Sequence, residues 1–327
     1  MKKIAFDIMG NDKGILPAIQ ASVEFAEQNP TFEIILVGNE DEINKHYKKK
    51  LNNIKIKDSK ITLKFTQQFR SVLNQSSSMI DAIKMVKNDE ADAVLSCGDS
   101  GMYLASSTFL IGRMPNISRP AFMPFIPTIK KDKQFLLLDV GANRENTPQQ
   151  LLEWAKLSSS FYKHMFNKEN PIVKLINIGE EEYKGTTLVR ETASLLQQEF
   201  TINYQGFIEP RILLNNETDI AIIDGFSGNL ILKSMEGAIL VFKSLLKESI
   251  LKTGWRKFLA LLLKPAFKEV GEKFDYRNVG AAWVIGLNKI VIKTHGSSDK
   301  KSFLGALNQV KIALEKNILE EVKRELE

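Results

Sequence analysis

Cysteine is almost absent from this chain, with one residue, Cys97, among 327. A single cysteine cannot form a disulfide within the chain, and such sparse use of cysteine fits a reducing cytoplasm. Long apolar runs are also missing, because no stretch approaches the roughly 18 residues that a membrane-spanning helix needs. The apolar run near Met1 is too short for a signal peptide. The sequence therefore predicts a cytoplasmic protein without a membrane-spanning helix.

Signatures of metal and nucleotide binding are missing as well. The three histidines, His46, His164 and His295, have no acidic or cysteine partners at metal-ligand spacing. No Gly-x-Gly-x-x-Gly follows the first predicted strand, and no Gly-x-x-x-x-Gly-Lys-[Ser/Thr] occurs anywhere. His46 and His164 lie on predicted helices, where we interpret them as solvated and structural. The sequence thus predicts no metal and no cofactor.

The composition is that of an ordinary globular protein, with 43% hydrophobic and 26% charged residues. The net charge of +6 modestly favours an acidic partner or an anionic surface. By itself this charge is not a nucleic-acid signature, and we expect no nucleic acid as partner.

Short β-branched runs alternate with amphipathic helical patterns along nearly the whole chain. This alternation predicts βαβ units and a mostly parallel sheet covered on both faces, a three-layer α/β/α fold. No low-complexity linker divides the chain, so residues 1–327 are expected to form a single large domain. The predicted strands are residues 3–8, 33–37, 61–65, 93–96, 121–126, 135–140, 173–178, 202–206, 220–223 and 290–293.

Glycine-rich, small-polar turns follow six of these strands. The stretch 220–233 shows the pattern best, because a buried strand leads through Asp224–Asn229 into a helix. Free backbone N–H groups and the helix dipole favour an anion at such a turn. Each turn alone is also explained by ordinary turn chemistry. Together they predict a shared anion-binding crevice at the carboxyl ends of the strands, built from residues 7–10, 96–101, 139–143, 179–185, 224–229 and 295–298.

Four side chains at these turns have candidate chemical roles. Cys97 lies near a helix N-terminus that can lower a thiol pKa, but no histidine is near it in sequence, and we interpret it as structural. Asp7 and Asp224 are either general bases or braces of their own turns. His295 opens a Gly-Ser-Ser turn after a strand, which favours a role in the site.

Residues 251–276 form an amphipathic insertion, in which Pro265 divides two short helices. Bulky apolar residues alternate with basic ones, a pattern that suits an anionic membrane interface. The alternative is a helical hairpin packed on the core or on a second subunit. The expected membrane contacts are Trp255, Phe258, Leu259, Leu262 and Phe267, with Phe274 on the second helix face.

Several ordered motifs resemble the PlsX family, the phosphate acyltransferases of bacterial phospholipid synthesis. They are MKKIAFDIMGND (1–12), ADAVLSCGDSG (91–101), RPA (119–121), LDVGAN (138–143), LINIGEEEYKG (175–185), DGFSGN (224–229) and HGSS (295–298). The resemblance covers nearly the whole chain. Departures are Asn11 for a second glycine, Cys97 for alanine, residues 72–75 for a basic run and residues 280–283 for Gly-Gly-Ala-Pro.

The resemblance implies a reaction in which inorganic phosphate attacks the thioester of a fatty acyl group on acyl carrier protein. It also implies a fold like isocitrate and isopropylmalate dehydrogenases, a protruding hairpin, a homodimer and peripheral membrane association. An acidic carrier protein calls for a basic docking patch. Two alternatives remain open: a nicotinamide-dependent dehydrogenase of this fold class, and a non-catalytic scaffold that binds acyl carrier protein.

We assign site roles from turn position and residue type. Lys184 supplies a charge to phosphate, Asn143 or Asn229 donates to the oxyanion, and His295 protonates the leaving thiol. The remaining candidates bind phosphate or substrate, partly through backbone N–H groups. They are Asp7, Gly10, Ser100, Gly101, Asp224, Ser227, Gly228 and Ser297.

Overall fold

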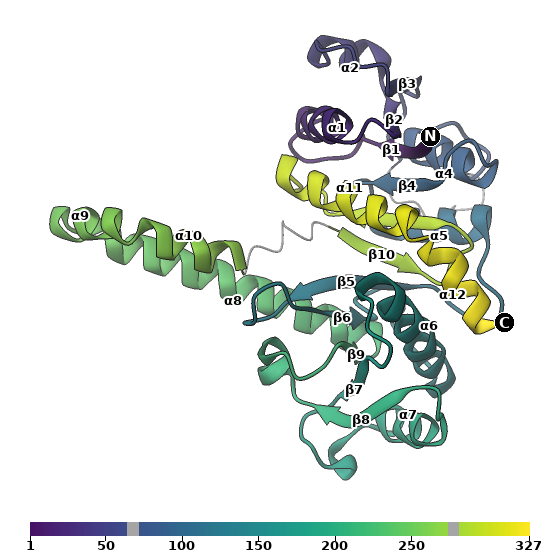
Figure 1. The fold of residues 1–327 in the computed structure, drawn as a ribbon, viewed down its shortest axis with the longest axis vertical. Helices are drawn as coiled ribbons and strands as arrows, with labels where there is room; N and C mark the ends of the chain where they lie inside the picture. The colour runs from purple at the N-terminus through teal and green to yellow at the C-terminus, as the bar shows by residue number, and fades with distance from the viewer. Residues whose placement is uncertain (64–71, 274–280) are drawn as a thin grey trace.

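The computed structural model describes residues 1–63, 72–273 and 281–327 (Figure 1). One mixed sheet of eleven strands runs through this part of the chain, in the order β3-β2-β1-β4-β11-β10-β5-β6-β9-β7-β8. The strands are β1 (Lys2–Asp7), β2 (Phe32–Gly38), β3 (Ile54–Asp58), β4 (Ala93–Ser96), β5 (Ala121–Pro127), β6 (Gln134–Leu138), β7 (Ile172–Ile176), β8 (Asn203–Ile208), β9 (Ile220–Ile222), β10 (Ala281–Ile285) and β11 (Ile290–Thr294).

Strand direction divides the sheet into two halves. Strands β3, β2, β1, β4 and β11 are parallel to one another, and so are β6, β9, β7 and β8. Between them, β10 is antiparallel to both β11 and β5, and β5 is antiparallel to β6. The predicted mostly parallel sheet is confirmed, but the second half runs opposite to the first.

Helices cover both faces of the sheet, so the three-layer arrangement is confirmed (Figure 1). Buried side chains of α1, α6, α11 and α12 fill one face, and those of α4 and α5, with the start of α8, fill the other. The helices are α1 (Leu16–Gln28), α2 (Glu40–His46), α4 (Ser78–Lys87), α5 (Ser100–Ile111), α6 (Pro148–Phe166), α7 (Thr187–Gln198), α8 (Gly225–Leu251), α9 (Gly254–Leu262), α10 (Lys264–Lys273), α11 (Lys300–Glu315) and α12 (Ile318–Leu326), with short 3₁₀ turns η1 (Glu182–Lys184) and η2 (Pro210–Asn215).

Three sequence-based assignments are corrected. The third strand lies at Ile54–Asp58 rather than at 61–65; residues 61–63 are not in a strand, and 64–65 fall outside the described residues. Isoleucines alternate with lysines in this edge strand, which is the usual pattern of a half-buried strand, and the prediction overlooked it. Strand β10, which lies between the predicted insertion and the predicted strand at 290–293, was missed. The predicted terminal helix is two helices, since Asn317 adopts a left-handed conformation with φ of 51° between α11 and α12.

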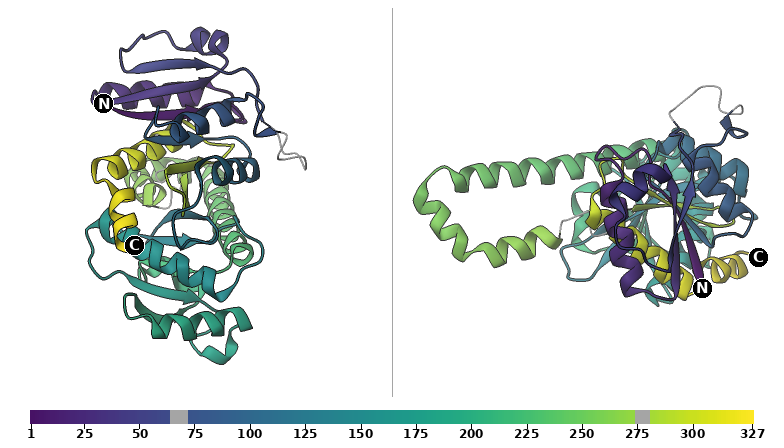
Figure 2. Two further views of the ribbon diagram at one scale, coloured as in Figure 1. Left: turned by 90° about the vertical axis from the view of Figure 1, so that its right-hand side faces the viewer. Right: turned by 90° about the horizontal axis from the view of Figure 1, so that it is seen from above.

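A helical arm projects from the body of the protein (Figure 2). The first turns of α8 pack on the sheet through Ile231, Leu232 and Met235, and the rest of α8 runs outward and returns as α9 and α10. Pro265 stands in the first turn of α10, where it lacks only a hydrogen bond that a helix start does not make. The expected insertion is therefore part of a longer arm that includes half of α8, and residues 274–276, including Phe274, lie outside the described residues.

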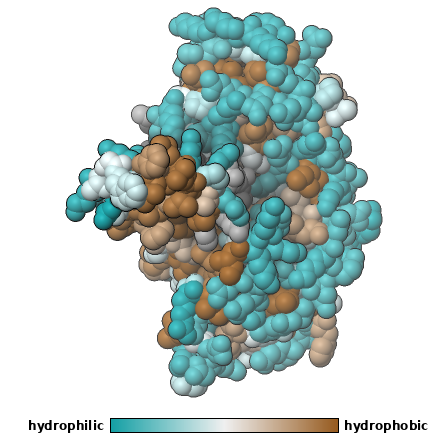
Figure 3. Space-filling view, turned by 60° about the vertical axis from the view of Figure 1, so that its left-hand side comes forward, coloured by the Kyte–Doolittle hydropathy of each residue, from teal (hydrophilic) through white to brown (hydrophobic). Residues whose placement is uncertain are grey.

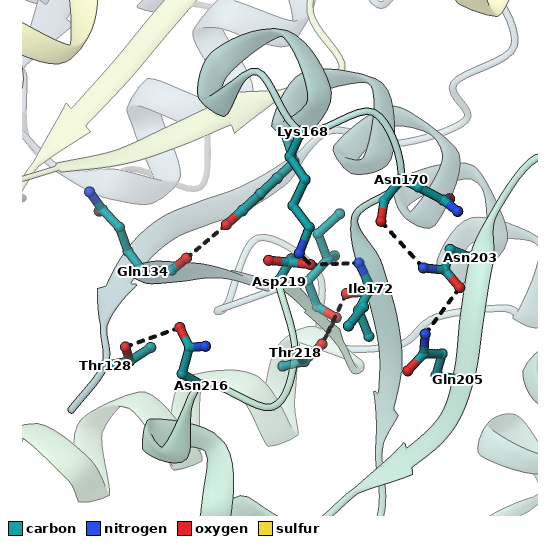
Figure 4. A network of polar contacts seen from close by, with 12 residues as sticks. Thr128, Gln134, Lys168, Asn170, Ile172, Asn203, Gln205, Asn216, Thr218 and Asp219 are labelled. Carbon is teal, nitrogen blue, oxygen red and sulfur yellow. Dashed lines mark hydrogen bonds and ion pairs between the residues drawn. The ribbon is translucent and has the colours of Figure 1, made fainter. Parts of the chain in front are cut away.

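Polar contacts pin the starts of β6, β7, β8 and β9 (Figure 4). Asp219 Oδ2 accepts hydrogen bonds from the Ile172 N–H at 2.6 Å and from Lys168 Nζ at 2.5 Å. The Thr218 hydroxyl donates to the carbonyl of Ile172 or Ile220, at 3.1 and 2.8 Å. These bonds satisfy backbone groups where the strands begin, so we interpret the network as structural.

Candidate active site

The six glycine-rich turns lie in two groups. The ends of β1, β4 and β11 are neighbours, since Asp7 is paired with Ser96 and Ser96 with Lys293. The ends of β6, β9 and β7 are neighbours in the other half of the sheet. Because the halves run in opposite directions, the groups lie at opposite ends of their strands. The six turns do not all lie along one edge of the sheet, so the expectation of a single edge is wrong. The two groups of turns can approach each other only over a face of the sheet.

Close backbone packing shapes the first group. Gly10 has a φ of +83°, and a Cβ there would lie 3.1 Å from the Gly98 Cα. Only glycine meets both demands, so its presence is explained without a ligand. The adjacent 295–298 turn is held by Asp12, whose N–H donates to the Gly296 carbonyl at 2.8 Å.

Helix α5 begins in the first group with open backbone donors. The Asp99 side chain caps the helix by accepting from the Met102 N–H at 2.9 Å. Within the described residues, the N–H groups of Ser100 and Gly101 have no hydrogen-bond partner, and both residues are exposed. The two residues predicted to bind phosphate thus present free donors to solvent, as that role requires.

His295 is exposed, and its ring is oriented by Ser297. The Ser297 N–H and hydroxyl lie 3.2 and 2.8 Å from His295 Nδ1. A backbone N–H can only donate, so Nδ1 is the acceptor and the neutral ring carries its proton on Nε2. Ser297, predicted to bind substrate, instead positions a histidine whose Nε2–H is left as a hydrogen-bond donor.

Asp7 is buried and braces its turn. Its exposed fraction is 1%, and its carboxylate accepts from the Ser96 hydroxyl at 2.6 Å and the Met9 N–H at 3.2 Å. Burial raises the pKa of Asp7 to about 6, against which the Ser96 hydrogen bond acts. A buried carboxylate repels phosphate, so direct phosphate contact by Asp7 is not supported and the bracing alternative is.

Lys293 is the functional candidate that the sequence reasoning missed. It lies beside Ser96 in the middle of the sheet with an exposed fraction of 6%, and burial lowers its pKa to about 8. Lysine is rarely buried unless it is paired. The signal was available, because a lysine interrupts the apolar run IVIKT just before His295.

Cys97 is unsuited to nucleophilic attack. Its exposed fraction is 1%, and its thiol points at the Met9 carbonyl oxygen, 3.2 Å away. Burial, and secondarily the charge of Asp7, raises the pKa of this thiol. The group therefore stays a neutral thiol, in agreement with its structural interpretation.

In the second group, Asp139 holds the turn after β6. This fully buried carboxylate accepts from the N–H groups of Phe122, Ala142 and Asn143 at 2.9, 3.1 and 2.8 Å, and burial raises its pKa. The Asn143 side-chain amide donates to the Pro120 carbonyl and to Asp139 Oδ2. Both amide hydrogens of Asn143 are thus committed inside the protein, and its predicted role as oxyanion donor is withdrawn.

The start of α8 is likewise occupied by protein groups. Asp224 caps the helix by accepting from the Ser227 N–H at 2.8 Å, and the Gly225 N–H donates to Asn146 Oδ1 at 3.1 Å. A Cβ on Gly228 would lie 2.0 Å from the Asp139 carbonyl oxygen. Capping and packing thus engage the Asp224 carboxylate, the Ser227 N–H and Gly228, and a role of these residues in phosphate binding stays a prediction.

Lys184 and Asn229 remain as open side chains of the second group. The Lys184 side chain is 37% exposed and its Nζ lies 2.8 Å from Glu181 Oε2. Asn229 packs against Gly141, and no hydrogen bond of its side chain occurs among the described residues. Asn229 is thus the asparagine that can still donate to a substrate.

A comparison with protein-family models matches residues 2–321 to the family described as fatty acid synthesis protein. A phosphate acyltransferase from Mycoplasmopsis pulmonis is 50% identical over 327 residues, which cover 100% of both chains. The chain belongs to this fatty acid synthesis family, the PlsX family. It is therefore an acyltransferase, and the alternatives of a dehydrogenase and a non-catalytic scaffold are set aside.

Solved structures share the fold of this PlsX-family chain. The EutD phosphotransacetylase from Staphylococcus aureus has a TM-score of 0.60 at 16% identity, with 96% of this chain and 94% of that chain covered. The 4-hydroxythreonine-4-phosphate dehydrogenase from Klebsiella pneumoniae has a TM-score of 0.52 at 10% identity, with 96% of this chain and 100% of that one covered. At these identities the likeness concerns the fold alone, and the specific relation to isocitrate and isopropylmalate dehydrogenases stays a prediction.

Other candidate sites are weak in the part of the PlsX-family chain that the structure describes. There, no group of three or more His, Cys, Asp or Glu side chains is arranged to hold a metal ion. An apolar cavity of about 30 Å³ lies under α12, among Leu157, Trp283 and Val322. It has room for about one water molecule and not for a fatty acyl chain.

We expect Gly228→Ala to be strongly destabilising. The new Cβ would overlap the Asp139 carbonyl, so the free energy of unfolding should fall by about 3 kcal/mol or more. Gly237→Ala is the matched control on the same helix, because nothing lies within 4 Å of its Cβ position, and it should gain up to about 1 kcal/mol. Urea unfolding of both variants measures this; equal stabilities would contradict the close approach.

The Asp7 carboxyl should make stability fall as pH rises through the acid range. Its pKa is 3.8 unfolded and about 6 folded, so the folded protein binds the extra proton between these values. Wild type should lose about 3 kcal/mol relative to Asp7→Asn from about pH 3 to about pH 7. Urea unfolding at a series of pH values tests this. Parallel pH profiles would show that the pKa is not raised.

Proposed function

We propose that this acyltransferase transfers a fatty acyl group from acyl carrier protein to inorganic phosphate, giving acyl phosphate for phospholipid synthesis. Full-length similarity to proteins named phosphate acyltransferase supports the phosphate acceptor. The observation that carries the proposal is the first group of turns. Open N–H groups at the start of α5 follow strand β4, and the oriented, exposed His295 follows the neighbouring strand β11.

The reaction needs no protein nucleophile. A phosphate oxygen attacks the carbonyl carbon of the thioester, a C–O bond forms, and the C–S bond breaks with its electron pair going to sulfur. Phosphate is already anionic, so the protein has to orient it, stabilise the oxyanion and stabilise the departing thiolate. A buried, neutral Cys97 agrees with this route.

Two residues fit the remaining steps. His295 Nε2–H donates a hydrogen bond to the departing thiolate, which takes its proton from water, since Ser297 holds the opposite ring nitrogen as an acceptor. Asn229 donates to the oxyanion, because its amide is uncommitted and Asn143 is not. Lys184 adds a positive charge on the side of Asn229, with β7 next to β9 in the sheet.

The projecting arm is proposed to bind an anionic membrane surface peripherally. Residues 240–271 contain seven basic and two acidic residues, which is nearly the whole excess of the chain's +6 charge. Trp255, Phe258 and Leu262 are 69%, 58% and 69% exposed, with Leu259 and Phe267 at 39% and 38%. Figure 3 shows the apolar side chains gathered on this arm. No described helix is long and apolar enough to cross a membrane.

A second copy of the chain is proposed to cover the inner part of the arm. Leu240, Val241 and Phe242 of α8 are more than half exposed, and α8 stands apart from α10 (Figure 2). A helix with such apolar surface needs a partner in water. A monomer in sedimentation equilibrium would remove this homodimer from the proposal.

The function predicts that purified protein consumes acyl carrier substrate only when phosphate is present. His295→Ala should lower kcat by about 10²-fold or more with an alkyl thioester, and much less with an aryl thioester whose thiolate leaves unprotonated.

His46→Ala is the control, because His46 is exposed on α2 and should leave turnover unchanged. Turnover without phosphate would reject the proposed reaction. An equal loss with both thioesters would reject only the role of His295 in stabilising the leaving thiolate.

The arm predicts selective binding to anionic vesicles. Leu262→Glu with Phe267→Glu should reduce co-sedimentation with phosphatidylglycerol vesicles at least about tenfold while sparing turnover in solution. Phe200→Glu, at a residue 95% exposed outside the arm, is the control and should bind as wild type does. Unchanged binding of the double variant would show that the arm does not contact the membrane.

A further inference from the structure

A row of polar side chains crosses the sheet beneath the start of α5. Asp7, Ser96 and Lys293 lie side by side on β1, β4 and β11. Two positions earlier on the same three strands lie Ala5, Val94 and Val291, which belong to the core under α4 and α5. Alternate strand residues share a face, so the row lies on the face that α4 and α5 cover. A charged row inside a sheet is costly and calls for a function.

Lys293 is a buried cation with unused donors. Its ammonium has three N–H groups, and among the described residues one acceptor is provided, the carbonyl oxygen of Thr294 next in the chain. No carboxylate in the described part of the chain forms an ion pair with it. Leaving donors of a charged group unmet in a buried site is expensive, so the geometry indicates an absent anionic partner.

Neighbouring groups keep Lys293 charged and leave one side open. Asp7 lies two strands away, about 10 Å at the usual strand spacing, too far for a direct ion pair but near enough to favour the ammonium. Cys97, also close, is a neutral thiol, and Asp99 is exposed at the cap of α5. On the β10 side the facing residue is Ala282, whose small side chain is only half-buried.

We propose that Lys293 binds the attacking phosphate, with the Ser100 and Gly101 N–H groups as further donors. This inference rests on the proposed function and locates its phosphate in the first group of turns. A lysine ammonium and helix N-terminal amides together suit a small dianion. His295 follows Lys293 by two residues, so phosphate held here lies beside the residue that donates a hydrogen bond to the thiolate.

Lys184 is less suited to this task. It is exposed and already paired with Glu181, whereas Lys293 is desolvated and unpaired. A desolvated cation attracts an anion more strongly, because water screens it less. Its position in the sheet also favours a small free phosphate over the phosphodiester of a carrier's prosthetic arm.

Phosphate binding can be tested without turnover. The Tm of wild type should be higher in inorganic phosphate than in potassium chloride of equal ionic strength. The Lys293→Met variant should not show this difference. Lys289→Met is the matched control, since Lys289 lies just before the same strand and pairs with Asp89 outside the site. It should keep the phosphate-dependent rise.

Without phosphate, Lys293→Met should be no less stable than wild type, because replacing a buried charge by an apolar side chain is often neutral or stabilising.

Kinetics separate the two possible phosphate sources. In Lys293→Met the KM for inorganic phosphate should rise about tenfold or more, with the KM for the acyl carrier substrate unchanged. A rise only in the carrier KM would assign Lys293 to the prosthetic arm and overturn the proposal. A phosphate-dependent Tm rise that survives in Lys293→Met would also overturn the proposal.

If that variant does not fold, Lys293→Gln is judged by the same two criteria and decides. Failure of wild type to turn over would reject the proposed function, while the Tm measurement would still judge the binding site.

Discussion

The antiparallel pairing of β5 with β6 is the constraint on which the arrangement of the site depends. Strand β10 is antiparallel to both neighbours, so β11 and β5 point the same way, and the reversal between β5 and β6 turns the second parallel half opposite to the first. The carboxyl ends of β1, β4 and β11 therefore lie at the other end of the strands from those of β6, β9 and β7. Helices α5 and α8 start from these opposite ends and lie on the same face. Groups from both halves can then face a substrate from two sides.

The two groups of turns use their polar residues differently. The Asp139 carboxylate and the Asn143 amide are satisfied within the protein, and Gly228 allows α8 to approach the Asp139 carbonyl. Around Lys293 the balance is incomplete, because the three N–H groups of the buried ammonium have one acceptor, and two backbone N–H groups have none, among the described residues. Satisfied polar groups stabilise a fold, and unsatisfied ones at a strand end are typical of a binding site.

The arm illustrates a second separation of roles. Its apolar residues contribute little to the core, since nearly all side chains from Leu240 to Val270 are exposed. Their exposure in water is unfavourable, which supports the proposal that a membrane or a second chain covers the arm. In this proposal, stability of the body and attachment to a surface reside in different residues.

The sequence by itself determined the family, the three-layer fold and the turns at strand ends, because ordered motifs and apolar periodicity are local properties of the chain. Trp255 and His295 are exposed, as a membrane contact and a site residue would be, and these two roles stay predictions. The mixed strand order, the commitment of Asn143 to Pro120 and Asp139, and the burial of Lys293 were decided only by the tertiary structure. Whether an amide or an ammonium is free to bind a substrate depends on groups distant in sequence that lie against it, and residue type alone does not specify them.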